Sequence, residues 1–168
     1  MPTIISPEDL IFGTPTSITF GGTEVGATLD PPTCVITPVL YKPDFQNAVG
    51  PVMGAVFITG AEVKAEITVN EFTAAKLAWA LPGATDVGGV ITWSPGRVEL
   101  SAFKDLVLTG ANLAGTPLVF TVKNALPEGA VTIAFSKTEL SGMKLTFVGY
   151  VDGDTPNTLP FEFELGSS

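Results

Sequence analysis

Apolar and polar residues alternate along much of the chain with the two-residue period of a β-strand. The clearest run covers residues 61–69. One face of this run carries Val63, Ala65, Ile67 and Val69, and the other carries Glu62, Lys64, Glu66 and Thr68. The pattern predicts an antiparallel strand with one buried face and one solvated face.

Further runs of this kind follow one another with few helical signals between them. The stronger ones cover residues 118–123, 131–136, 143–148 and 159–164, and the weaker ones cover 17–20, 33–41, 55–59, 89–93 and 103–109. Many short strands separated by turn residues are typical of mainly β domains. We therefore predict a mainly β fold, an antiparallel β-sandwich or barrel.

One segment, about residues 70–81, has the pattern of a short helix instead. Asn70 can cap its start, or Thr68 and Glu71 can form a capping box. Pro82 follows and is expected to end it. The side chains spaced to pack a helix against a sheet are Phe72, Ala75 and Trp79.

Three segments lack a clear period. Residues 42–53 are predicted to form a long loop between strands, and such loops in compact domains are commonly functional. Residues 1–16 and 152–168 are rich in turn residues and are predicted to be N-terminal and C-terminal arms. The chain has 168 residues, the length of a single domain, which we place over residues 1–168.

Charged residues make up only 15% of the chain, against about 25% in a typical domain. A monomer with so few charges exposes much apolar surface, so we expect extensive contacts between subunits. The formal net charge of −9 favours solubility and disfavours binding to DNA or to a membrane surface. The longest uncharged runs, residues 45–61 and 106–122, contain Gly or Pro together with Asn, so neither is predicted to be a membrane helix.

The chain contains no histidine and one cysteine, Cys34. Without histidine, the Ser/His/Asp and Cys/His catalytic arrangements and histidine metal sites are excluded. A single cysteine excludes both a disulfide within the chain and a CxxC metal site. Cys34 lies in an apolar run, where a small core residue is the favoured interpretation.

Acidic residues offer the remaining candidates for chemistry. Residues 152–157 begin like a calcium loop but lack its downstream acidic ligands, so a turn is favoured. Glu62 and Glu66 share a strand face about 13 Å apart, too far for a glycosidase pair. Glu162 and Glu164 are closer, about 7 Å apart, but a solvated face is favoured for them. We therefore expect no catalytic residues, no metal and no cofactor.

The order of the predicted elements along the chain resembles that of a known protein family. A Gly-rich opening, Gly21-Gly22-Thr23-Glu24-Val25-Gly26, precedes the alternating strand, and Asn70-Glu71-Phe72-Thr73 then opens the short helix. Late in the chain, Lys144-Leu145-Thr146-Phe147-Val148-Gly149-Tyr150-Val151-Asp152 forms a closing strand motif. From about residue 20 to 155, this order resembles the major tail tube proteins of long-tailed bacteriophages.

The resemblance implies a β-sandwich or barrel flanked by one helix, in a structural virion protein that is not an enzyme. It implies that six subunits form a ring and that rings stack into the hollow tail tube, which delivers phage DNA to the host. The lumen in that family is acidic, so DNA passes without specific binding. The implied partners are further copies of the chain and the tape measure and tail terminator proteins, and no membrane is involved. The implied location is the virion tail, which is assembled in the host cytoplasm.

Two sets of residues are the candidate assembly sites. Glu62, Lys64 and Glu66 are candidates for a polar or lumen-facing sheet surface. The candidates for an inter-ring loop are Asp44, Phe45, Gln46, Asn47, Val49 and Val52. A solvated sheet face and an ordinary surface loop remain the alternatives.

Two other functions stay open on the sequence. Another β-rich virion module, such as a capsid decoration or receptor-binding domain, shares the Gly- and Pro-rich composition and stops at a closed oligomer. A carbohydrate-active enzyme needs a convergent acid pair in a cleft with aromatic walls, and the sequence shows no such pair.

Overall fold

The computed structural model of the protein describes residues 15–28, 30–46, 49–71, 73–111, 115–133 and 142–165. Most of the predicted N-terminal arm lies outside these residues, and so do Asn47 and Phe72. Within them, every strand pairing is antiparallel. The elements are β1 (Ser17–Phe20), β2 (Thr23–Glu24), β3 (Thr33–Tyr41), β4 (Phe57–Val69), α1 (Ala74–Ala80), β5 (Ala84–Val87), β6 (Val90–Trp93), η2 (Leu100–Ala102), β7 (Lys104–Ala111), β8 (Pro117–Ile133), β9 (Met143–Val148) and β10 (Phe161–Leu165).

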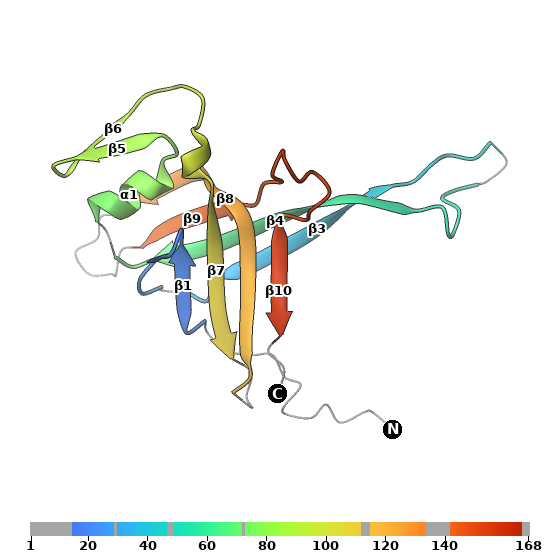
Figure 1. Ribbon diagram of the computed structural model, residues 1–168, viewed down its shortest axis with the longest axis horizontal. Coiled ribbons are helices and arrows are strands. Elements are labelled where there is room, and N and C mark those ends of the chain that lie inside the picture. The colour runs from blue at the N-terminus through green and yellow to red at the C-terminus, as the bar shows by residue number, and fades with distance from the viewer. Residues whose placement is uncertain are drawn as a thin grey trace.

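Apart from β5 and β6, which pair only with each other, the strands form two layers that share β8. The first part of β8 pairs with β7 and β10, and together with β1 and β2 these make the first sheet. The second part pairs with β9, which continues through β4 to β3 as the arm sheet. Figure 1 shows the strands of the two sheets crossing at a steep angle. Of the predicted alternatives, the structure has the open sandwich, because the strand order from β2 to β3 does not close into a barrel.

β8 turns from one sheet into the other near Asn124. This residue has a φ of 46°, the one positive φ found for a non-glycine residue in the described part of the chain. Asparagine tolerates that conformation because its short polar side chain can bond locally. Here the Asn124 backbone N–H donates to Asp105 at 3.0 Å, and its side-chain amide donates to the Tyr150 carbonyl at 3.3 Å. A strand that changes sheets at such a corner is how steeply crossed sheets are joined.

The core lies between the two sheets. The four apolar residues predicted for the buried face of β4, from Val63 to Val69, are all buried, which confirms that prediction. Phe147 of β9 is fully buried, and its ring centroid lies 5.0 Å from that of Phe20 in β1. Apolar rings from both sheets therefore meet at the centre of the molecule.

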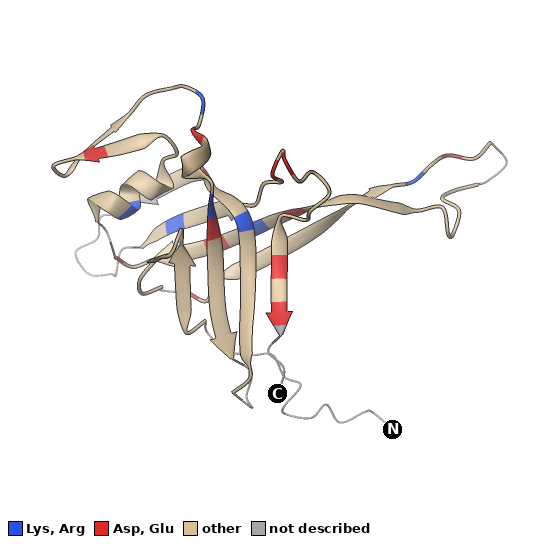
Figure 2. Cartoon of the chain, in the orientation of Figure 1, with Lys and Arg blue, Asp and Glu red and all other residues tan. Residues whose placement is uncertain are grey.

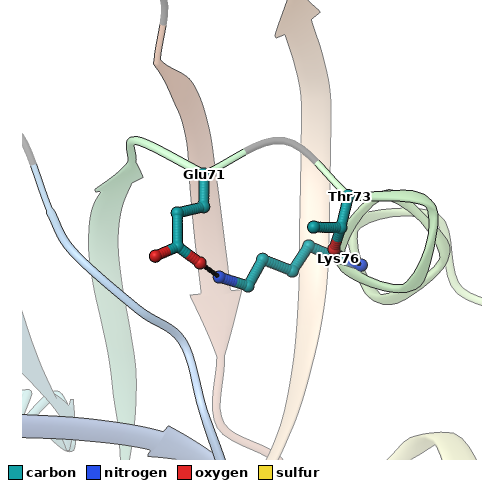
Figure 3. Close-up of polar contacts among 3 residues, drawn as sticks. All are labelled: Glu71, Thr73 and Lys76. Carbon is teal, nitrogen blue, oxygen red and sulfur yellow. Dashed lines mark hydrogen bonds and ion pairs between the residues drawn. The ribbon is translucent and has the colours of Figure 1, made fainter.

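The helix begins four residues later than predicted, at Ala74. Asn70 does not cap it, because its backbone N–H donates to the Ala27 carbonyl at 2.9 Å and so continues the pairing of the preceding strand. Thr73 is the cap instead, and its hydroxyl accepts a hydrogen bond from the Lys76 backbone N–H at 3.2 Å (Figure 3). The strand ladder thus shortens the helix at its start.

Lys76 is the one charged residue buried in the described part of the chain. Its ammonium group forms an ion pair with the carboxylate of Glu71, just before the helix (Figure 3). Gly26 lies against this pair, with a φ of +92° and no room for a Cβ beside the Glu71 carboxylate. A buried charge without a partner is strongly destabilising, so the pair fixes α1 over the sheets.

The segment predicted as a C-terminal arm contains a strand, which overlaps the run predicted at residues 159–164. β10 pairs with β8 from Phe161 to Leu165, which places this segment in the first sheet. Before it, the Asp152 side chain accepts a hydrogen bond from the Asp154 backbone N–H at 3.0 Å. Asp152 therefore stabilises a turn of the kind that Asx residues commonly make.

Gly149 lies where the Val63 and Val122 side chains leave no room for a Cβ, and it yields a stability prediction. A Cβ at this position would collide with the Val63 side chain and lie 2.9 Å from the Pro160 carbonyl. We expect Gly149→Ala to destabilise the fold by about 1–3 kcal/mol through overpacking. Thermal unfolding followed by circular dichroism should show a melting temperature lower by roughly 2–12 °C. Gly153→Ala, where a Cβ meets nothing within 4 Å, is the matched control and should melt like the parent protein.

Candidate assembly surfaces

The face of β4 predicted to be polar is exposed. Glu62, Lys64 and Glu66 all lie in the solvent, and they alternate with buried Val63 and Ala65. This follows from the strand pleat, which sends successive side chains to opposite sides of the sheet. The core covers one side of the arm sheet, so these three residues lie on its other, outer side.

Strand register adds residues from neighbouring strands to this outer side. Thr33 of β3 and Thr146 of β9 lie opposite Glu66, and Glu128 of β8 lies opposite Thr146. Directly opposed residues of an antiparallel pair share a face. Lys144 of β9 reaches Glu66 in an ion pair of 2.7 Å. Sequence reasoning missed Glu128 and Lys144, although the alternation over residues 143–148 was a signal for Lys144.

We call Glu62, Lys64, Glu66, Glu128 and Lys144 the polar face of the arm sheet. It holds three carboxylates and two ammonium groups, so it is slightly acidic. The Lys144–Glu66 pair is largely exposed, and such pairs contribute about 0–1 kcal/mol. Phosphate is held by clusters of Lys and Arg, which this face does not offer. Its chemistry suits a surface that stays hydrated and does not retain nucleic acid.

The outer side of the first sheet also carries carboxylates (Figure 2). Glu162 and Glu164 of β10 are exposed there, and Glu162 forms an ion pair with Lys123 of β8 at 2.6 Å. The hydrogen bond with Glu162 raises the pKa of Lys123. Glu24 of β2 is exposed on the same side, opposite Thr19. Both outer sides of the sandwich are therefore polar.

β3 is an edge strand whose core-facing side chains are only half covered. Among the described residues it pairs with β4 alone. Cys34 and Ile36 lie opposite the buried Ala65 and Val63, yet Ile36 is 43% exposed. Pro38 lies within this strand, and proline in sheets is confined to edges and bulges because it lacks an N–H. β3 thus offers an unpaired backbone edge flanked by apolar side chains.

Cys34 lies in this edge strand and is exposed, so the predicted core position is wrong. Partial burial of its thiol raises the pKa to about 11. A thiol with this pKa stays protonated at neutral pH, which disfavours a nucleophilic role.

Beyond the sandwich, β3 and β4 extend as a long hairpin, which we call the arm (residues 39–58; Figure 1). Lys42 and Asp44 are its only charged residues, and Figure 2 shows how sparse charge is along it. Among the predicted loop residues described, Asp44, Phe45, Gln46, Val49 and Val52 are all exposed. Exposed apolar side chains continue along the arm at Val39, Leu40, Tyr41, Met53, Val56, Phe57 and Ile58. Exposed apolar side chains gathered along one segment are typical of a site of protein contact.

The helix residues predicted to pack on the sheet are placed differently from one another. Trp79 is half-buried, with its ring centroid 6.1 Å from that of Phe20 in an edge-to-face arrangement. Ala75 is exposed, whereas Lys76 and Ala80 are the buried residues of the helix.

In the part of the chain that the structure describes, no group of three or more acidic, cysteine or histidine side chains is arranged to hold a metal ion. Within the same residues, no helix has the length and apolar character needed to span a bilayer.

Comparison with solved structures finds a match over nearly the whole chain. A chain of an extracellular contractile injection system, in the cryo-EM structure of the PVC sheath-tube complex in its extended state, aligns with a TM-score of 0.51. The alignment covers 94% of this chain and 93% of that chain, at 15% sequence identity. The fold is tail-tube-like.

A second solved structure matches more weakly. It is the cap of the anti-feeding prophage, described as the AFP tube terminating cap, with a TM-score of 0.44, 17% identity and 94% of each chain covered. No protein-family model and no curated protein matches the sequence. The tail-tube-like fold therefore rests on the shape of the chain.

Proposed function

We propose that this chain is a structural subunit that self-assembles into stacked rings forming a hollow tail tube, through which phage DNA is delivered. The observation that carries the proposal is the arm sheet, which combines unpaired edges with an uncovered apolar arm. Exposed strand edges and apolar patches favour association with other chains, so these surfaces suit an assembled subunit better than a monomer. The tail-tube-like fold supports the same role. Acting as a tube wall requires no catalysis.

Rings would form by pairing of sheet edges between copies. Among the described strands, the arm sheet has two free edges. One is β3, and the other is the part of β8 that follows Ala125, where its pairing with β7 ends. Pairing the first edge of one copy with the second edge of the next is a head-to-tail contact, which gives a closed ring when the rotation closes. The arm sheets would then join into one barrel without edges. Six subunits per ring is the number that the phage resemblance implies.

The polar face of the arm sheet would line the channel. Its other side is covered by the core and the first sheet, so Glu62, Lys64 and Glu66 are on the side left free to face a lumen. A slightly acidic lining offers phosphates no tight site, so DNA can pass.

The arm would reach the next ring, where its apolar residues become covered. Tape measure and tail terminator proteins are proposed as partners at the inside and at the end of the tube.

Electron microscopy of the concentrated purified protein, together with its mass by light scattering, tests the proposal. Hollow rings or tubes with a central channel are the expected result. A closed, solid oligomer that never stacks would overturn it in favour of a capsid decoration or receptor-binding module. A protein that stays monomeric at high concentration would contradict spontaneous self-assembly.

A further inference from the structure

The free edge of β3 is interrupted at one residue. Pro38 lies in the ladder opposite Ala61 of β4. Proline has no backbone N–H, and within a sheet its nitrogen faces the free edge. A strand that pairs with β3 therefore finds no donor at this position. Residues 39–41 of β3 follow the interruption.

The free edge of β8 is interrupted by a bulge. Residues 129–131 face a single residue of β9, because the register between the two strands shifts between Glu128 and Thr132. Gly129 has a φ of +100°, which takes the backbone out of the extended conformation. A bulged strand does not present evenly spaced N–H and C=O groups at its edge. Residues 126–128 precede the bulge, in the part of β8 that no longer pairs with β7.

We propose that Pro38 of one copy faces the β8 bulge of the next copy, and that these two interruptions set the register of the ring contact. The inference rests on the proposed function, in which β3 pairs with β8 between copies. The strand order β8-β9-β4-β3 is antiparallel at every step, so β3 and β8 run in opposite directions. Rotation about a ring axis keeps these directions, so the contact between copies is antiparallel.

Placing Pro38 opposite the bulge gives one definite register. Residues 126–128 of one copy then pair with residues 39–41 of the other, with Glu128 opposite Val39. The two stretches are equally long, so neither leaves an unpaired overhang. The alternation along β3 and β4 puts Val39 on the same side of the sheet as the polar face, to which Glu128 belongs. The register therefore continues the polar face from one copy to the next.

The neighbouring register that keeps the same faces together is shifted by two residues and loses more hydrogen bonds. It places Pro38 opposite Pro127 of β8 and the bulge opposite Ile36. Pro127 also lies within a ladder and withholds a donor from its free edge, so two opposed prolines form no backbone hydrogen bond. In the proposed register Pro127 faces Leu40 instead, which has an N–H to donate. A shift in the other direction leaves residues 126 and 127 beyond the end of β3.

Disulfides between copies measure the register. In the full chain with Cys34→Ser, which removes the single native cysteine, Val39→Cys is combined with Glu128→Cys. Directly opposed residues have Cα atoms about 4.5–5.5 Å apart, and a disulfide forms only when this distance is below about 7 Å. Within one chain, β3 and β8 are three strand spacings apart, at least about 14 Å, so the second cysteine has to come from another copy.

The matched control combines Thr37→Cys with Glu128→Cys in the same background. Thr37 is exposed and lies on the same side of β3 as Val39, about 7 Å away along the strand. Both proteins are assembled, oxidised, run on denaturing gels without reductant, and imaged by electron microscopy. We expect a ladder of covalent oligomers that forms at least about tenfold faster for the Val39 pair than for the Thr37 pair.

Pro38→Val, added to both proteins, tests whether the proline sets the register. Valine restores the missing N–H, which in the shifted register can donate to the Pro127 carbonyl. The preference for the Val39 pair should therefore fall by about fivefold, the value of one backbone hydrogen bond. An unchanged preference would overturn the role of Pro38.

The other outcomes separate this inference from the tube function. Tubes in which the Thr37 pair links as fast as the Val39 pair, or in which neither pair links, would overturn the register and leave the tube function standing. If the Cys34→Ser chain forms no tubes and neither pair links, both are overturned. The expected ladder without tubes would establish the register and overturn the tube function.

Discussion

A lysine at position 36 is expected to abolish ring and tube formation while leaving the monomer folded. Ile36 points to the core side of the edge strand β3 but is 43% exposed, so one chain alone can accommodate a lysine there. Pairing this edge with another copy would bury the new charge without a partner, at a cost of several kcal/mol. Each 1.4 kcal/mol lowers an association constant about tenfold, so assembly should fall by two orders of magnitude or more. Sedimentation and electron microscopy of the variant measure this loss.

Thr37→Lys is the matched control for the edge. Thr37 is the next residue of the same strand, exposed, and lies opposite Glu62 on the polar face. A lysine there adds the same charge to the same strand but faces solvent or the channel, so tubes should still form. Far-UV circular dichroism confirms that both variants remain folded. If Ile36→Lys assembles as well as Thr37→Lys, β3 is not a pairing edge.

The sequence predicts a strand well when one of its faces is exposed to solvent and the other is buried. β4 is such a strand, and its burial follows the period from Val63 to Val69. β8 shows the limit. Its two halves were predicted as separate strands at residues 118–123 and 131–136, because the apolar face switches where the strand leaves one sheet for the other near Asn124. A change of layer is decided by long-range packing, which local periodicity does not record.

In the candidate site, too, some residues follow from the local pattern of the sequence and others do not. The exposed position of Glu62 and Glu66 follows from the alternation, but their neighbours Glu128 and Lys144 follow only from strand register, which depends on pairing across long stretches of chain. The helix was predicted too long because the strand pairing at Asn70 outweighs its capping ability. Strands were predicted on both sides of the loop, at residues 33–41 and 55–59, but their pairing into one long hairpin depends on register and was missed.

Reversing the charge of the polar face is expected to turn a channel that releases DNA into one that retains it. The double variant Glu62→Lys and Glu128→Lys replaces two exposed carboxylates and leaves the Lys144–Glu66 ion pair in place. The polar face becomes strongly basic in every subunit, and stacked rings repeat it along the channel. Neutralising about 6–10 phosphates gives binding that weakens by roughly 10³–10⁵ between 50 and 200 mM salt. Subunits assembled with short DNA duplexes and then treated with nuclease should protect DNA at low salt, whereas the parent protein should protect none.

Protection from nuclease, more than binding itself, distinguishes the two sides of the sandwich. The variant Glu24→Lys and Glu164→Lys adds the same charge to exposed positions on the outer side of the first sheet. If the arm sheet lines the channel, this variant binds DNA on the outside of the tube, where nuclease can reach it. The opposite result is protection by the variant with Glu24→Lys and Glu164→Lys and none by the variant with Glu62→Lys and Glu128→Lys. That result would mean that the first sheet, and not the arm sheet, faces the channel. The two variants carry equal net charge, so a difference in protection reports where each sheet lies in the wall of the tube.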